Sequence, residues 1–184
     1  MIVAKSNLEV AIKASLHAGK EIIRIYNDTK ADLELELKTD DSPLTVADRN
    51  ANEVILSYLS QTSFPVLSEE GGEIPYEVRK DWALFWMVDP LDGTKDFLRR
   101  NGEFTVNIAL ISNREPVLGV IYIPDRQVLY FAEKGSGAFK ITDVVWDDAV
   151  DWNKLLLRAV KLPLPMYREG VIVASSRSYV NVHV

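Results

Sequence analysis

The chain has 184 residues, 47% of them hydrophobic, which is enough to bury the core of one domain, or of one domain plus part of another. Its 26% of charged residues is ordinary for a globular protein and argues against disorder. Its formal net charge of −6 argues against binding of nucleic acid polymers, whose phosphates are held mainly by Lys and Arg. With no Cys and only two His, disulfides and a typical zinc site are excluded, so any metal ion is expected to be bound by oxygen, which favours Mg²⁺, Mn²⁺ or Ca²⁺.

The N-terminal part of the chain contains one predicted helix and one predicted strand. Apolar residues at helical spacing predict a helix over residues 8 to about 26, with Asn7 as its N-cap. Strict alternation of apolar and charged residues over 33–38 predicts a strand with one solvent-facing side.

A second helix, over residues 45–60, and a short strand, over residues 65–67, are predicted next. Thr45 and Asp48 have the spacing of a capping pattern at the start of that helix. The short strand is followed by two consecutive acidic residues, of which Glu69 is the candidate ligand and Glu70 the solvated neighbour.

The middle of the chain contains a series of predicted strands separated by turns. They cover residues 84–88, 104–111, 117–123 and 127–132, and the last three form a meander. We therefore predict an α+β fold in which a mostly antiparallel sheet is packed with helices. The pattern weakens beyond residue 139, and residues 162–165 are typical of a linker. We expect an N-terminal domain over 1–160 and the start of a second, α/β domain over 161–184.

Acidic residues follow these strands or start a helix, and they are expected to converge on one rim of the sheet. Pro90 fixes φ and is expected to end the strand, so that the turn brings Asp89, Asp92 and the Leu91 carbonyl to one point. Three such oxygens suit a hard divalent cation, and Glu69 could supply a fourth.

Gly93 and Thr94 open a short helical stretch directly after these acidic residues. A helix N-terminus offers free N–H groups to a phosphate, so metal ligands and phosphate donors occur within six residues of each other. This arrangement suits metal-assisted hydrolysis of a phosphate ester. The alternative is an exposed turn, since Asp, Pro and Gly are common turn residues. The apolar strand before Asp89 and the position of Thr94 favour the functional interpretation.

Four segments in order resemble signatures of the inositol monophosphatase superfamily of lithium-sensitive, magnesium-dependent phosphatases. They are residues 40–48, 67–70, 86–94 and 101–111. Within the superfamily, Lys95-Asp96-Phe97 and the run from Asn101 are most similar to CysQ-type 3'(2'),5'-bisphosphate nucleotidases. The resemblance implies a layered, sugar-phosphatase-like fold. It also implies removal of the 3'-phosphate of adenosine 3',5'-bisphosphate to give AMP, a reaction that belongs to sulfur metabolism.

The resemblance also implies a role for each site residue. Glu69, Asp89, the Leu91 carbonyl and Asp92 are expected to bind Mg²⁺, and Thr94 with Asp48 to orient and deprotonate the attacking water. The substrate is expected to contact Glu69, Leu91, Asp92, Gly93 and Thr94. A helix cap without a catalytic role is the alternative for Asp48.

Two other functions remain open from the sequence. One is an inositol or sugar monophosphate phosphatase. The other is a catalytically inactive truncated remnant, because the family's Trp-Asp-x-Ala-Ala-Gly motif in the second domain has no match here. Trp146-Asp147 resembles it but lacks the Ala-Gly step, so a solvated loop or helix start is expected there. The resemblance leads us to expect that most of the second domain is missing, through a shortened gene or a cut chain.

The expected partner is a small phosphorylated metabolite, adenosine 3',5'-bisphosphate, and a homo-oligomer is left open. No apolar run reaches the roughly 20 residues that a transmembrane helix needs, and the first residues lack a secretory signal. A cytoplasmic location is expected, with peripheral association with the inner membrane left open.

Overall fold

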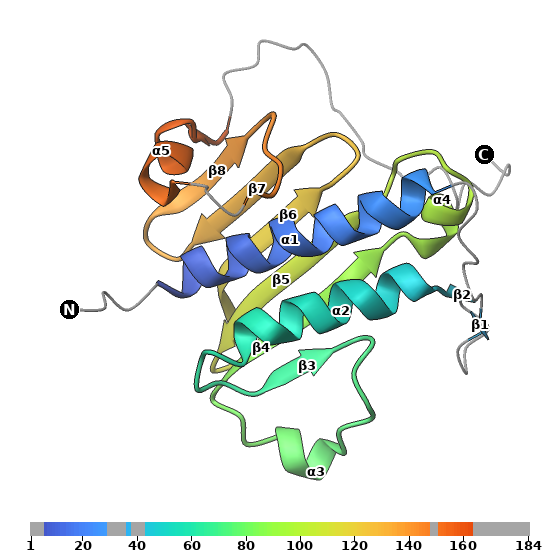
Figure 1. Cartoon of the computed structure of the whole chain (residues 1–184). Helices are drawn as coiled ribbons and strands as arrows, with labels where there is room; N and C mark the ends of the chain where they lie inside the picture. Colours follow the sequence, from blue (N-terminus) through green and yellow to red (C-terminus); the bar gives the residue numbers. More distant parts are fainter. Residues whose placement is uncertain (1–5, 29–35, 38–42, 148–150, 164–184) are drawn as a thin grey trace, which may run out of the picture.

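Two long helices lie side by side across one face of a seven-stranded sheet (Figure 1). The computed structural model describes residues 6–28, 36–37, 43–147 and 151–163. The strand order follows the chain, and all neighbouring pairs are antiparallel except β3 with β4, which is parallel. The strands are β3 (Val66–Ser68), β4 (Leu84–Asp92), β5 (Thr105–Ser112), β6 (Glu115–Ile123), β7 (Val128–Glu133), β8 (Gly137–Ile141) and β9 (Val160–Lys161). The predicted α+β class with a mostly antiparallel sheet is confirmed.

The helices of the described ranges are α1 (Asn7–Asn27), α2 (Val46–Leu59), α3 (Tyr76–Arg79), α4 (Thr94–Leu98) and α5 (Trp152–Leu157). Three of them, α1, α2 and α4, begin close to where the sequence predicts them, whereas α3 and α5 were not predicted. The N-cap of α1 is Ser6 and not Asn7, because Ser6 has an extended backbone and its hydroxyl accepts a hydrogen bond from Glu9 N at 3.1 Å. The expected capping pattern at the start of α2 is confirmed as a full capping box between Thr45 and Asp48.

The core lies between these two helices and the sheet. α1 packs along α2, against β5 and across β6, while α2 lies over β4. Gly19 allows the close approach of α1 to β6, since a Cβ at this position would lie 2.3 Å from Cε1 of Tyr122. Buried side chains of the helices and of alternate strand positions fill the layer, including Ile12, Ile22, Ile55, Leu59, Trp86, Val106, Ile108 and Leu129.

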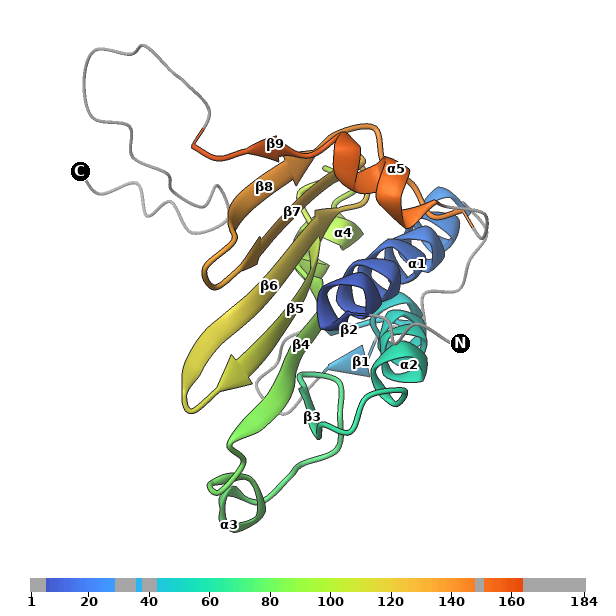
Figure 2. The same cartoon turned by 90° about the vertical axis from the view of Figure 1, so that its left-hand side faces the viewer.

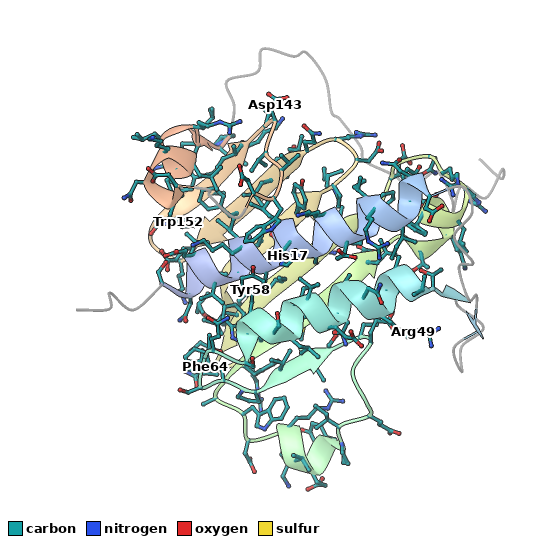
Figure 3. The ribbon with its side chains drawn as sticks, in the orientation of Figure 1. His17, Arg49, Tyr58, Phe64, Asp143 and Trp152 are labelled. Atoms are coloured by element: carbon teal, nitrogen blue, oxygen red, sulfur yellow. The ribbon has the colours of Figure 1, made fainter. Side chains whose placement is uncertain are left out.

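An aromatic cluster fixes the segment after β8 to both helices. His17 of α1 stacks on Trp146 with 4.9 Å between ring centroids, and Tyr58 of α2 contacts both rings edge-on. Figure 3 shows His17 and Tyr58 on neighbouring helices, where His17 Nδ1 lies 3.3 Å from the Tyr58 hydroxyl. The ring of Trp146 is therefore half-buried by packing, while its neighbours Val145 and Asp147 are exposed in a loop, as expected for this segment.

The opposite face of the sheet is not covered by any of the helices of the described ranges (Figure 2). Met87 and Ile121 are 45% and 46% exposed there, although both lie on central strands. This face matters for the site below, because several acidic side chains lie at its end.

Some predictions fall partly or wholly outside the described residues. Of the predicted strand over 33–38, the structure describes β1 (Glu36–Leu37), which pairs with β2 (Pro43–Leu44). The weak pattern over 144–160 includes α5 and the first residue of β9, neither of which was predicted. The second domain over 161–184 stays a prediction, since residues 164–184 lie outside the described part. Among the helices that the structure describes, none is long and apolar enough to cross a bilayer.

Candidate active site

A β-bulge places Asp89 and Asp92 on the same, open face of the sheet. The β4–β5 register pairs Asp89 with Asn107 and Asp92 with Thr105, so two residues of β4 stand opposite one residue of β5. In an uninterrupted strand, residues three positions apart point to opposite faces, and one extra residue returns them to a common side. The two residues between the acidic ones, Pro90 and Leu91, are both buried.

This bulge corrects the expectation that Pro90 ends the strand. β4 runs on to Asp92, because a bulge is one of the few places in a sheet that tolerates a residue without an N–H. The bulge nevertheless turns both carboxylates to one side of β4, as expected, while their convergence with the Leu91 carbonyl on one point stays a prediction. The sequence pattern identified the residues but assigned them to a turn after the strand.

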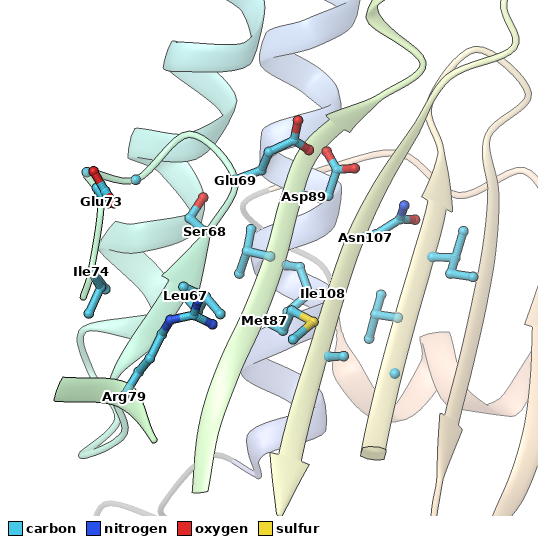
Figure 4. A pocket seen from close by; sticks show the side chains of 17 residues that line it. Leu67, Ser68, Glu69, Glu73, Ile74, Arg79, Met87, Asp89, Asn107 and Ile108 are labelled. Atoms are coloured by element: carbon cyan, nitrogen blue, oxygen red, sulfur yellow. The ribbon is translucent and has the colours of Figure 1, made fainter. Parts of the chain in front are cut away.

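Glu69 reaches the same rim from the neighbouring strand. β3 runs parallel to β4, and the hydrogen bond from Glu69 N to Val88 O, at 3.0 Å, holds the end of β3 against β4. Figure 4 shows the Glu69 and Asp89 side chains together at this end of the strands. Burial, followed by the nearby charges of Glu69 and Asp92 and a hydrogen bond with Glu69, raises the pKa of Asp89 to about 7. Carboxyl groups so close together create a site short of positive charge.

Asp48 uses its two carboxylate oxygens for two different partners. Oδ2 accepts hydrogen bonds from Thr45 N at 2.8 Å and from Thr45 Oγ1 at 2.5 Å. Oδ1 accepts a hydrogen bond from Thr94 Oγ1 at 3.1 Å. Asp48 is 0% exposed, and burial raises its pKa, partly offset by these hydrogen bonds. The cap and the pairing with Thr94 were alternatives in the sequence, and the structure contains both.

Gly93 forms the turn from β4 into α4 in a conformation that suits glycine. Its φ is +96°, and a Cβ there would lie 2.8 Å from the Glu103 carbonyl oxygen. The first hydrogen bonds of α4 are donated by Asp96 and Phe97 to Gly93 O. The N–H groups of Gly93 and Thr94 therefore precede the hydrogen-bond ladder of this helix.

Two polar residues that the sequence interpretation did not assign contact the site. Asn107 Nδ2 donates to Asp92 Oδ2 at 3.1 Å. Asn52, one turn after Asp48 on α2, accepts from Ser68 Oγ at 2.7 Å and donates to Glu70 O at 3.5 Å, so it holds both neighbours of Glu69. Glu69 is exposed and Glu70 is half-buried. A sequence signal for Asn107 was its place within residues 101–111.

The donor set has the chemistry of a magnesium site, since Glu69, Asp89, Asp92 and the Leu91 carbonyl offer only oxygen. A divalent cation would offset the burial and the nearby negative charges that raise the pKa of Asp89. In the described part of the chain, no three His, Asp or Glu side chains are arranged so that they could hold a metal ion as they stand. A cation could bind at this rim only after these side chains rotate toward one another.

A cavity of about 780 Å³ begins at this rim and runs along the open face of the sheet. Glu69, Asp89 and Asn107 lie at its acidic end, and Met87 and Arg79 lie farther along (Figure 4). The cavity places a largely apolar floor next to the proposed phosphate and metal site.

Comparison with known proteins gives a consistent relationship along most of the chain. The model of the inositol monophosphatase family matches residues 4–163. The 3'(2'),5'-bisphosphate nucleotidase CysQ of Salmonella typhimurium is 49% identical over 131 residues, which are 70% of this chain and 52% of that protein. The protein of the same name from Shigella flexneri is 39% identical over 175 residues, covering 94% of this chain and 67% of that protein.

Solved structures agree with these matches. The crystal structure of CysQ from Bacteroides thetaiotaomicron superposes with a TM-score of 0.85 at 47% identity, covering 99% of this chain and 66% of that chain. The suhB protein of Bartonella henselae gives a TM-score of 0.62 at 39% identity over 71% of this chain and 49% of that one. The chain thus spans about half to two thirds of the length of these relatives.

Proposed function

The chain belongs to the inositol monophosphatase family, and on that premise we propose that it carries the metal and phosphate site of a Mg²⁺-dependent 3'(2'),5'-bisphosphate nucleotidase. Enzymes of this family are generally metal-dependent. The observation that carries the proposal is the hydrogen bond from Thr94 to the buried Asp48, next to the acidic residues at the end of β4.

The metal ligands in this proposal are Glu69, Asp89, Asp92 and the Leu91 carbonyl. When bound, Mg²⁺ supplies positive charge to the phosphate oxygens and acidity to water. The chain contributes the placement of the ligands: the bulge turns Asp89 and Asp92 to one side, and the parallel pairing of β3 with β4 brings Glu69 beside them.

Thr94 and Asp48 orient and deprotonate the attacking water in this proposal. The Thr94 hydroxyl donates to Asp48 Oδ1, so its oxygen can accept a hydrogen bond from water, and the proton passes through Thr94 to Asp48. The raised pKa of Asp48 favours proton acceptance. The water oxygen bonds to phosphorus, the ester bond to the leaving 3'-oxygen breaks, and that oxygen takes a proton from solvent.

The transferred phosphate is held by the start of α4. The N–H groups of Gly93 and Thr94 precede the helical hydrogen bonds and are available as donors. We propose adenosine 3',5'-bisphosphate as the substrate because two relatives in the comparison are named 3'(2'),5'-bisphosphate nucleotidases. A cytoplasmic location is part of this proposal.

The proposal is tested by phosphate release with Mg²⁺ from adenosine 3',5'-bisphosphate and, in parallel, from inositol 1-phosphate. We expect preference for the nucleotide and loss of turnover in Asp89→Asn. Preference for the inositol ester would contradict the proposed nucleotide substrate. Equal turnover in Asp89→Asn and wild type would show that the active site lies elsewhere.

A further inference from the structure

We propose that Asn107 is a positioning residue for metal binding, because its side-chain amide holds one oxygen of Asp92 and leaves the other for the cation. This inference rests on the proposed function, in which Asp92 is a metal ligand. Asn107 lies on β5 directly opposite Asp89, and its neighbour on the same face of β5, Thr105, lies opposite Asp92.

The orientation of the Asn107 amide is set by a second hydrogen bond. Thr105 Oγ1 donates to Asn107 Oδ1 at 3.1 Å, and Asn107 Nδ2 donates to Asp92 Oδ2 at 3.1 Å. The amide oxygen can only accept, so the Thr105 hydroxyl holds it and turns the NH₂ group toward the carboxylate. The result is a chain of three side chains, from Thr105 through Asn107 to Asp92, across two strands.

Asp92 needs such a partner because it is exposed at the end of a strand. A free carboxylate side chain samples several rotamers, and fixing it in one rotamer when a metal ion binds costs conformational entropy. A neutral donor restrains Asp92 without adding charge to a rim where Asp92 already helps to raise the pKa of Asp89. Partners of this kind behind metal ligands commonly affect metal affinity about 10–100-fold.

A direct contact with substrate is the competing role, since Asn107 also lines the 780 Å³ cavity. The two roles differ in what a substitution changes. A positioning residue alters the affinity for the metal in the absence of substrate, whereas a substrate contact alters KM for the substrate and leaves metal binding unchanged.

The test is binding of Mn²⁺ to the full chain, followed by the electron paramagnetic resonance signal of free Mn²⁺ without substrate. We expect Asn107→Leu, which has a similar size but no amide, to weaken Mn²⁺ binding about tenfold. Thr105→Val, which keeps the amide but frees its orientation, is expected to weaken binding by a smaller factor.

The matched control is Asn101→Ala. Asn101 Nδ2 donates to Asp96 Oδ1 at 2.7 Å. The substitution therefore removes the same type of Asn–Asp hydrogen bond, but from an aspartate that is not a proposed ligand. We expect its Mn²⁺ affinity to equal that of wild type. Thermal unfolding without metal shows whether each variant folds, and if Asn107→Leu does not, Thr105→Val decides.

The outcomes separate the two proposals. If wild type binds Mn²⁺ and Asp89→Asn does not, but Asn107→Leu and Thr105→Val bind like wild type, the role of Asn107 is overturned and the site stands. If wild type does not bind Mn²⁺, or Asp89→Asn binds it equally well, the proposed site is wrong and the role of Asn107 falls with it.

Discussion

The hydroxyl of Thr94 lies 3.1 Å from Oδ1 of Asp48, and this hydrogen bond joins residues 46 positions apart in the chain. The other oxygen of Asp48 caps α2 through Thr45. One buried carboxylate therefore fixes both the start of a core helix and the turn after β4. Its structural and proposed chemical roles use different oxygens, so substitutions can separate them.

Asp48→Asn is expected to lower kcat for phosphate release at least 100-fold, because an amide cannot accept the proton of the attacking water. Thr45→Ala removes the cap donor and acceptor but leaves the carboxylate, so we expect a loss of about 1 kcal/mol in unfolding free energy and kcat within a few-fold of wild type. Urea unfolding and a phosphate-release assay measure the two effects. Equal kcat values in Asp48→Asn and wild type would exclude Asp48 as the base.

Gly93→Ala is expected to lower the free energy of unfolding by about 3 kcal/mol, because it combines a left-handed backbone with a clash. The new Cβ would lie 2.8 Å from Glu103 O. Gly135→Ala is the matched control: its φ is +88° but no atom lies within 4 Å of the added Cβ. We expect Gly135→Ala to cost about 1 kcal/mol. Similar losses for both variants in urea unfolding would show that the close approach at Gly93 has no energetic effect.

The sequence predicted local features well and the relations between strands less well. The capping box of Thr45 and Asp48 depends on residues three positions apart, so its pattern is visible in the sequence. The bulge at Asp89 depends on which residue of β5 stands opposite, and no local pattern in β4 contains that register. For the same reason the carboxylates were identified, while Asn107, which contacts Asp92 across the strands, was not.

The parallel pairing of β3 with β4 was also beyond local patterns. The strand over 65–67 was predicted from a short apolar run, which does not show the direction in which it pairs. Pro90 did not show whether β4 ends or continues through a bulge, since proline is found both at strand ends and at bulges.

The contribution of Asp89 to the stability of the metal-free protein is expected to fall as pH rises from about 4 to about 7. Asp89 has a pKa of about 7 when folded, above its ordinary value of 3.8, so the folded state holds this proton more tightly than the unfolded state. Its stabilising contribution is complete below about pH 4 and is lost as pH rises through about 7. The raised pKa of Asp48 acts in the same direction.

Urea unfolding at pH 5 and pH 8 in the presence of a chelator measures this effect, with Asp89→Asn as the comparison. We expect a smaller pH dependence in Asp89→Asn. Added Mg²⁺ should stabilise wild type at pH 8 more than Asp89→Asn, because the ion binds the folded state. Identical pH profiles for the two proteins would contradict the raised pKa of Asp89.

Tyr122→Phe is expected to remove one buried hydrogen bond and, with it, the loss of stability that titration of the Tyr122 hydroxyl causes at alkaline pH. The Tyr122 hydroxyl donates to Val144 O at 2.8 Å, and burial raises the pKa of Tyr122 to about 12. The loss of the bond should cost about 1 kcal/mol. In wild type the stabilisation that depends on neutral Tyr122 is complete below about pH 10 and lost as pH rises through about 12. The free energy of unfolding, measured from pH 8 to pH 11, should fall more steeply in wild type than in Tyr122→Phe. Parallel curves for the two proteins would contradict this.

The most direct test of the proposed site is a crystal structure of the chain grown with Mn²⁺ and recorded at the manganese absorption edge. We predict an anomalous peak contacted by the carboxylates of Glu69, Asp89 and Asp92 and by the carbonyl oxygen of Leu91. The same crystals of Asp89→Asn should lack that peak. Manganese bound elsewhere, with no peak at the end of β4 in wild type, would contradict the proposal.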